Sequence, residues 1–414
     1  MPVGVPVALR GPHTQDNAAD RQGKCRTQFG GQVWLGCDPF GTDNEWNSGT
    51  GQTQNRFMGG VMIAQCRTSA LAALALVLVA IPEAEAGRPG GGATPPPTYP
   101  PARAWQSMSA NNAGTTSSTS GRVYMFGGDS ASGTAMNDLW YYSVASGLWT
   151  MLAPASRTQS LYGRKLASLT CGDGQCVLFG GLSTKVYNEA WYFTEPTGTG
   201  TTVTWSKVSC SKSAPCPSPR YAPLTAFDPT RHYRVSFGGS ANSDSDNASL
   251  ADTWTLAGSR WTRQQPQHSP PARTDGSATF VPGNNKVVIF GGDSWPNAPY
   301  PQPLCDLWAW DGSDWQAVSA AGTAPCLTGA AMGWDGTRLV VTGGFMDAYY
   351  TLPNTGTWYF EFSGSNAGTW TKDISTVCAP LSGARGAYDP ASKKFVFFGG
   401  YAYPDTSNST LVCP

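Results

Sequence analysis

The sequence predicts an all-β fold, a six-bladed β-propeller, because one pattern of residues recurs along most of the chain. Six Gly-Gly pairs lie 53, 58, 53, 52 and 56 residues apart, by subtraction of their positions. A period of about 50 residues is typical of one propeller blade. Each pair follows a short apolar run, and the first five pairs precede two tryptophan-bearing stretches. The pairs begin at Gly127, Gly180, Gly238, Gly291, Gly343 and Gly399.

Each repeat supplies segments for four antiparallel strands, which together make one blade. The innermost strand is predicted from small residues ahead of the glycine pair, as in residues 166–170 (LASLT), because strands crowd near a propeller axis. The next is the β-branched and aromatic run before the pair, such as VYMF before Gly127. Two outer strands are predicted around paired tryptophans: Trp140 and Trp149, Trp191 and Trp205, Trp254 and Trp261, Trp308 and Trp315, Trp358 and Trp370.

These residues resemble the kelch repeat, with its Gly-Gly, an aromatic residue about a dozen positions later and a tryptophan after that. The segments Arg122–Trp149 and Lys286–Trp315 match that pattern closely. The resemblance covers residues 104–414 and is specific, because six copies agree. It implies a kelch-type propeller of the superfamily that includes galactose oxidase.

The sixth repeat is incomplete, since no third-strand tryptophan follows Gly399-Gly400. The segment around Trp105 looks like an orphan third strand, comparable to the segment around Trp149. We therefore expect the last blade to be closed by the N-terminal strand around Trp105. Closure of this kind removes exposed sheet edges.

The chain ahead of the propeller divides into three regions. Residues 62–86 have a basic residue, an apolar core and an Ala-Glu-Ala ending, which are the parts of a secretory signal peptide. Residues 1–61 lack any repeat and are expected to be disordered or to reflect a mis-assigned start, with translation beginning at Met62 or Met58. Residues 87–103 form a Gly/Pro-rich linker. A secreted protein is expected, with a periplasmic or cell-surface location as the alternative.

Cysteine usage agrees with an oxidising compartment. Of 11 cysteines, Cys25, Cys37 and Cys66 precede the predicted cleavage, which leaves 8, an even number. Local pairing is expected for Cys171 with Cys176 and for Cys210 with Cys216. The other four could pair as Cys305–Cys326 and Cys378–Cys413, although sequence alone does not fix connectivity. Asn247 and Asn408 begin glycosylation sequons.

Composition and motifs argue against several classes of function. The formal net charge is zero and charged residues make up 13% of the chain, so a nucleic-acid footprint is not expected. A galactose-oxidase-like copper site needs two histidines near the axis, whereas His232 and His268 fall in a turn and a linker and are expected to be solvated. The acidic loop at 244–247 departs from the EF-hand pattern, and no GxSxG element occurs. We predict no metal and no cofactor.

Four arginines are the candidate ligand-binding residues, because each precedes the innermost strand of a repeat: Arg164, Arg220, Arg273 and Arg385. By resemblance to kelch domains, they could line one mouth of the central channel and bind an acidic group. The competing interpretation is that each ties an inter-blade linker to nearby carbonyls. Trp295 and Tyr349, in variable loops after two glycine pairs, are further candidates for stacking on a sugar or peptide.

Together these observations favour a monomeric binding module for a glycan or an acidic protein partner over an enzyme. The alternative is a cofactor-free enzyme of the sugar mutarotase or epimerase type, which needs arginines and glutamates such as Glu189, Glu195 and Glu361. A galactose-oxidase-like enzyme is a weaker alternative, and no membrane span is expected after signal cleavage.

Overall fold

The computed structural model describes residues 97–414, except 112–120, 157–160, 242–248, 295–301, 348, 350, 376–377, 379 and 403–404. The predicted upstream segment (1–61), the signal peptide (62–86), most of the linker (87–103), the loop at 244–247 and Trp295 therefore lie outside the described residues.

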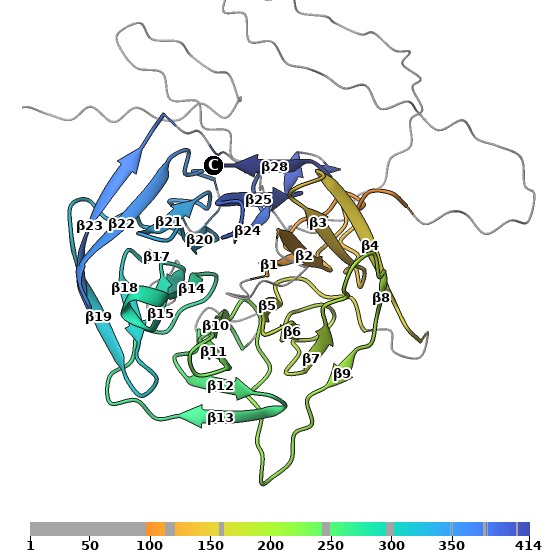
Figure 1. Ribbon diagram of the computed structural model, residues 1–414, viewed down its shortest axis with the longest axis horizontal. Coiled ribbons are helices and arrows are strands. Elements are labelled where there is room, and N and C mark those ends of the chain that lie inside the picture. Colours follow the sequence, from red (N-terminus) through yellow and green to blue (C-terminus); the bar gives the residue numbers. More distant parts are fainter. Residues whose placement is uncertain are drawn as a thin grey trace, which may run out of the picture. The chain divides into compact units, whose positions relative to one another are not determined.

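The described chain is all-β, with one 3₁₀ turn at Pro282–Asn284 and no α-helix. Its main strands form six antiparallel sheets, or blades, in chain order around a ring (Figure 1). Blade 1 consists of β1 (Ser107–Ala110), β2 (Arg122–Phe126), β3 (Leu139–Ser143) and β4 (Leu148–Pro154), and the short strand β8 (Thr202–Val203) pairs in parallel with β4. Blade 2 consists of β5 (Ser168–Gly172), β6 (Gln175–Phe179), β7 (Ala190–Thr194) and β9 (Ser206–Lys207). Blade 3 consists of β10 (Leu224–Asp228), β11 (Tyr233–Phe237), β12 (Thr253–Ala257) and β13 (Arg260–Gln264).

Blades 4 to 6 follow the same order, and blades 4 and 6 each carry a short hairpin after the glycine pair. They are β14 (Ser277–Val281), β15 (Lys286–Phe290), β18 (Leu307–Trp310) and β19 (Trp315–Ala321), with hairpin β16 (Asp293–Ser294) and β17 (Gln302–Pro303); β20 (Ala331–Trp334), β21 (Leu339–Thr342), β22 (Thr357–Gly364) and β23 (Ala367–Asp373); and β24 (Arg385–Asp389), β25 (Lys394–Phe398) and β28 (Thr410–Cys413), with hairpin β26 (Tyr401–Ala402) and β27 (Asp405–Thr406). The eight-stranded sheet of blades 4 and 5 arises because β19 pairs in parallel with β23.

The ring is closed through its innermost strands. Each of β1, β5, β10, β14 and β20 packs against the innermost strand of the next blade, and β24 packs against β1. The small-residue segments predicted to be innermost are therefore placed correctly. The six-bladed propeller predicted from the sequence is the fold of the described chain.

The predicted closure by the N-terminal strand is wrong. The strand that follows Trp105 is β1, which pairs with β2 as the innermost strand of blade 1, and within the described residues blade 6 has the three main strands β24, β25 and β28. The N-terminal segment does contact blade 6, but through loops: the Arg103 N–H donates to the Ser407 carbonyl, and the Gly400 N–H donates to the Arg103 carbonyl. The segment after Trp105 is therefore the innermost strand of blade 1, a strand that the repeat pattern alone did not identify.

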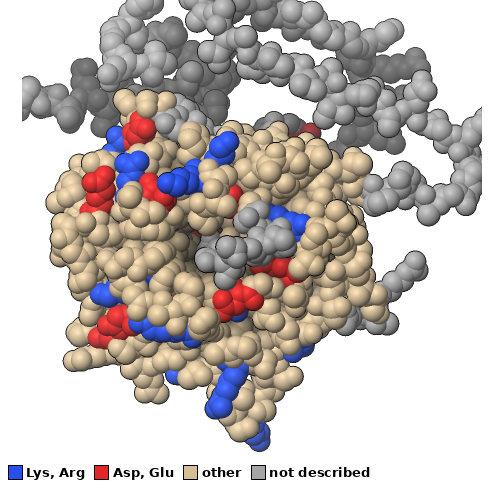
Figure 2. All heavy atoms as spheres, viewed as in Figure 1, with Lys and Arg blue, Asp and Glu red and all other residues tan. Residues whose placement is uncertain are grey.

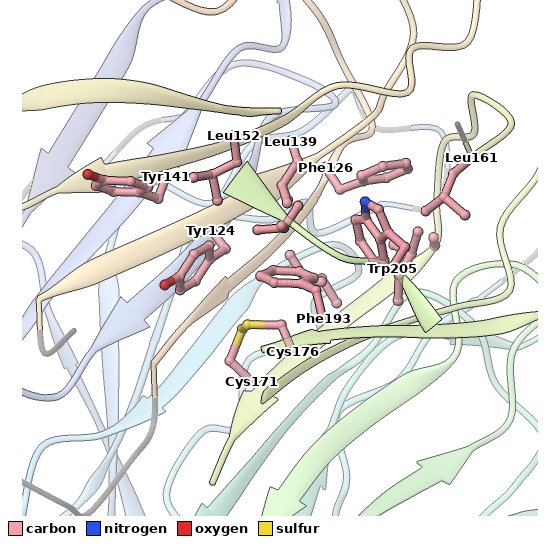
Figure 3. Packing of buried hydrophobic residues seen from close by; sticks show 14 residues of the cluster. Tyr124, Phe126, Leu139, Tyr141, Leu152, Leu161, Cys171, Cys176, Phe193 and Trp205 are labelled. Carbon is pink, nitrogen blue, oxygen red and sulfur yellow. A yellow bond between two sulfur atoms is a disulfide. The ribbon is translucent and has the colours of Figure 1, made fainter. Parts of the chain in front are cut away.

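Tryptophans fill the spaces between blades. In Figure 3, Trp205 of blade 2 packs between Phe126 of β2 and Phe193 of β7, with ring centroids 5.7 and 4.8 Å away. Such aromatic pairs contribute about 0.5–1.5 kcal/mol beyond the burial of their area. Four other outer-strand tryptophans pack in the same way on the phenylalanine that ends the second strand of the preceding blade: Trp149 on Phe398, Trp261 on Phe179, Trp315 on Phe237 and Trp370 on Phe290.

The interface between blades 5 and 6 departs from this rule. Blade 5 has Thr342 where the other blades have phenylalanine, and its hydroxyl lies 3.3 Å from that of Thr357. The nearby core instead contains the buried disulfide Cys378–Cys413, packed with Val340 of β21 and Tyr388 of β24. A disulfide thus occupies the interface at which a tryptophan would be expected.

The described residues contain four disulfides, and they join the pairs suggested by spacing: Cys171–Cys176, Cys210–Cys216, Cys305–Cys326 and Cys378–Cys413. The first links β5 to β6, and the second lies in the segment between β9 and β10. The other two tie the linkers that lead into blades 5 and 6. All four are compatible with an oxidising compartment.

The glycine pairs are required because neighbouring blades approach closely there. Gly238 has φ of +63°, and a Cβ on it would lie 2.5 Å from the Arg273 carbonyl oxygen of the next blade. The N–H of Gly239 donates to that same oxygen at 2.9 Å. A side chain at Gly238 would therefore break the contact that joins blade 3 to blade 4.

Candidate functional site

Three of the four candidate arginines are part of the fold. The side chains of Arg164, Arg220 and Arg273 are fully buried between blades. The guanidinium of Arg220 donates to the Gly238 carbonyl at 3.0 Å and binds both carboxylate oxygens of Asp252 at 2.6 and 2.9 Å. The Trp254 indole donates to the same carboxylate at 2.7 Å. We call this arrangement of arginine, glycine carbonyl, acidic residue and tryptophan the clasp.

The clasp recurs in four blades, each time four residues before the innermost strand begins. Its other members are Arg103 with Gly127, Asp138 and Trp140; Arg164 with Gly180, Glu189 and Trp191; and Arg273 with Gly291, Asp306 and Trp308. Arg103 was missed, although Pro101-Ala102-Arg103 repeats Pro271-Ala272-Arg273 and could have identified it. The interpretation that arginines tie linkers to carbonyls is thus correct for these positions.

Electrostatics follow from this burial. Desolvation opposes the charged form of Asp252, but hydrogen bonds from Arg220 and Trp254 outweigh it and lower the pKa of that carboxyl. Burial lowers the pKa of Arg164, with the charge of Glu189 acting in the opposite direction. The guanidinium groups of these clasps are fully buried against glycine carbonyls and carboxylates, so they are not positioned to hold a ligand.

Arg385 is different, because it is the first residue of β24 and does not precede that strand by four positions. Its side chain lies at the central channel, a cavity of about 550 Å³ lined by the six innermost strands. The lining is mostly small, with alanines and hydroxyl residues such as Ser168, Thr225 and Ala278. Arg385 is therefore the one candidate arginine that borders a space able to hold a ligand.

The mouth of this channel is a ring of six residues with left-handed backbone, which we call the rim. Each lies two residues after a clasp position, so that every blade contributes one: Trp105, Leu166, Ala222, Asp275, Gly329 and Gly383. Backbone hydrogen bonds run around it, since the N–H of Leu166 donates to Trp105, that of Ala222 to Leu166, that of Asp275 to Ala222, that of Gly329 to Asp275, and that of Trp105 to Gly383. The rim is thus a rigid frame made by the main chain.

An ion pair crosses this rim. One terminal nitrogen of Arg385, from blade 6, lies 2.7 and 2.9 Å from the two carboxylate oxygens of Asp275, from blade 4. The intervening blade 5 contributes Gly329, which has no side chain to obstruct the pair. The guanidinium also lies over the Trp105 ring, 4.7 Å from its centroid, and the Trp105 indole donates to the Tyr401 hydroxyl at 2.9 Å. Charge and an aromatic face therefore meet at one mouth of the channel.

The other candidate binding residue that the structure describes is Tyr349, which is 60% exposed in the loop between β21 and β22. Its ring is accessible from solvent. Trp295 lies outside the described residues. The structure therefore brings Arg385 together with Trp105 and Asp275, neither of which was a sequence candidate for ligand binding.

The groups needed for the enzymatic alternatives lie away from the channel. His232 pairs with Asp173 and His268 with Asp314, and both histidines are exposed. Glu189 belongs to a clasp, Glu361 is exposed on β22, and none of the described channel-lining residues is a glutamate. The described lining of the cavity thus contains Arg385 but no glutamate, whereas a mutarotase-type reaction would use both.

Glu195 is buried beside Cys171 and Cys176, close enough in space to suggest a metal cluster. The two sulfurs are joined in a disulfide, which leaves no thiolate to bind an ion. The carboxylate instead accepts hydrogen bonds from Asn111 and from the Tyr124 hydroxyl, at 2.9 and 3.1 Å. Burial and the charge of Glu195 raise the pKa of Tyr124. This cluster is a structural element of blades 1 and 2.

The charged surface offers no broad patch on the face seen in Figure 2, where basic and acidic side chains are interspersed among uncharged ones. In the described part of the chain, no helix has the length and apolar character needed to cross a bilayer. A scan of protein-family models matched none, and a search of curated protein sequences found no match. The resemblance to kelch repeats thus rests on the repeated residues themselves.

Proposed function

We propose that this chain is a secreted kelch-type β-propeller that acts as a binding module, with its ligand held at the rim of the central channel by Arg385. The observation that carries the proposal is the contrast among the arginines. The four clasp arginines are buried and bound within the fold, whereas Arg385 borders the cavity. An acidic group on a glycan or on a protein segment is the chemistry that a guanidinium recognises.

Secretion is supported by two independent features of the chain. Residues 62–86 have the composition of a signal peptide, and the four disulfides of the propeller require an oxidising environment to persist. The location is therefore proposed to be extracellular.

The test is a glycan and acidic-peptide array probed with the full chain, run beside an anomerisation assay. The variant Arg385→Ala should lose the signal, and Arg260→Ala, which removes an exposed arginine of β13, should keep it. Binding that survives Arg385→Ala would overturn the proposed site. Anomerisation that depends on Arg385 would favour the mutarotase alternative instead.

A further inference from the structure

The rim of the channel carries charges of both signs. Besides Arg385 and Asp275, charged residues occur in the isolated β-bridges formed by the segments next to the rim residues. They are the ion pair Lys165–Asp129 and the buried Asp293, which accepts a hydrogen bond from Thr328 at 2.9 Å. The described rim residues, these β-bridge residues and Arg385 together include three carboxylates and two cationic side chains: Asp129, Asp275 and Asp293, and Lys165 and Arg385. Asp275 places a negative charge directly beside Arg385, so a ligand that is only anionic is also repelled, which weakens its attraction to Arg385.

Arg385 nevertheless has unused donors. A single terminal nitrogen makes both contacts with Asp275, and the remaining nitrogens of the guanidinium have no hydrogen-bond partner among the described residues. A guanidinium has five N–H donors in a planar fork, so the Nη1 and Nε donors of Arg385 can still donate to the oxygens of a ligand carboxylate. The central carbon of the guanidinium lies over the Trp105 ring, 4.7 Å from the ring centroid. A ligand carboxylate can therefore bind Arg385 without displacing Asp275.

Asp275 then decides which carboxylates are accepted. Its side chain is 12% exposed, and a ligand carboxylate on the neighbouring arginine would lie close to its negative charge. A cationic group on the ligand removes that repulsion by bonding to the carboxylate of Asp275, which can accept more than the contacts from Arg385. The favourable ligand has both charges, a few ångströms apart.

We propose that the rim binds a small zwitterion of the α-amino-acid type, with its carboxylate on Arg385, its ammonium on Asp275 and its side chain in the channel. This inference rests on the proposed function and specifies the ligand class for the same site. The cavity of about 550 Å³ beneath the rim, lined by groups such as Ala278 and Met108, has room for an apolar side chain.

The experiment compares ligands that differ only in charge, by titration calorimetry on the full chain. The probes are L-phenylalanine, N-acetyl-L-phenylalanine, which lacks the cation, and L-phenylalanine amide, which lacks the anion. We expect each singly charged probe to bind at least about tenfold more weakly than the zwitterion, equivalent to about 1.4 kcal/mol. Equal affinities for the three probes would overturn the proposal.

Two variants assign the charges to their residues. Asp275→Asn should reduce the ratio between the affinities for L-phenylalanine and for N-acetyl-L-phenylalanine. Arg385→Gln should reduce the ratio between the affinities for L-phenylalanine and for L-phenylalanine amide. Asparagine tolerates the left-handed backbone at position 275, where φ is +55°, so this variant is expected to fold. Arg385→Lys, which keeps the charge, should retain part of the binding.

Failure of the inference is distinguishable from failure of the proposed function. If no free amino acid binds at millimolar concentration, or if Asp275→Asn leaves the charge preference unchanged, the zwitterion proposal is wrong. If an array ligand without a cationic group binds in an Arg385-dependent manner, the zwitterion proposal is also wrong, but the proposed binding site at Arg385 stands. Loss of any dependence on Arg385 would overturn both.

Discussion

The linker that leads into each blade is attached differently in two parts of the ring, blades 1 to 4 and blades 5 and 6. In the first group a buried arginine binds a glycine carbonyl and an acidic side chain. In blade 5 the arginine is replaced by Leu327, and Asn354 alone donates to the Gly343 carbonyl and accepts from the Trp358 indole. The linkers into blades 5 and 6 are instead fixed by disulfides.

The difference shows that the geometry of the interface is what the fold requires, and that the charge is optional. An ion pair stabilises the folded state only when both partners and their hydrogen bonds are in place. A disulfide acts largely by restricting the unfolded chain. The two groups of blades should therefore respond differently to mutation, reduction and acid.

Removal of a clasp arginine should have the largest effect. Arg220→Ala leaves the Asp252 carboxylate and the Gly238 carbonyl without their guanidinium, and we expect a loss of about 3–5 kcal/mol in the free energy of unfolding. Arg385→Ala leaves Asp275 without its ion-pair partner but breaks no contact with a glycine carbonyl, and it should lose less, about 1–3 kcal/mol. Urea denaturation measures both. A small loss for Arg220 with a large one for Arg385 would reverse the roles assigned to them.

Removal of the disulfide at blade 6 should come next. The pair Cys378→Ala with Cys413→Ala opens a crosslink of sequence separation 35, and a loop of that size corresponds to about 3–4 kcal/mol. The matched control, Cys210→Ala with Cys216→Ala, opens a separation of 6 and should lose about 2 kcal/mol. Equal losses in chemical denaturation would show that loop length is not what distinguishes these bridges.

Acid should have the smallest effect, and it should act on the charged clasps. Because the pKa of Asp252 is lowered in the folded chain, its contribution is present above its unfolded pKa of about 3.9 and is lost as the pH falls through the folded value. Asp252→Asn should be less stable than the wild type at pH 7, and the gap should narrow below about pH 4. A constant gap from neutral to acid pH would exclude the clasp carboxylate as its source.

Sequence reasoning could predict the fold because the repeat is carried by residues whose roles are local and steric. The glycine pairs, the apolar runs and the paired tryptophans recur in nearly the same form, so six blades follow from counting them. Closure could not be predicted in this way, because the segment 107–110 has the small residues of an innermost strand as well as a preceding tryptophan, Trp105.

The candidate site was predicted only in part, since sequence position alone does not show which way an arginine faces. Arg385 was grouped with three clasp arginines because all lie near the start of an innermost strand. The clasp arginines lie four residues before the innermost strand, whereas Arg385 is its first residue. Asp275 is 110 positions from Arg385 in the chain, and only the closure of the ring brings the two side chains together. Contacts across a propeller axis join residues that no local pattern connects.

The rim has one more consequence, which concerns how such a protein can change over evolutionary time. Its frame is made of main-chain hydrogen bonds and left-handed backbone, so its shape is independent of most of the side chains it presents. Glycine, asparagine and aspartate adopt this conformation readily. An exchange such as Asp275→Asn would alter the charge at the mouth while keeping a residue that adopts the left-handed backbone. New ligand specificity can thus be acquired one residue at a time, without a change of architecture.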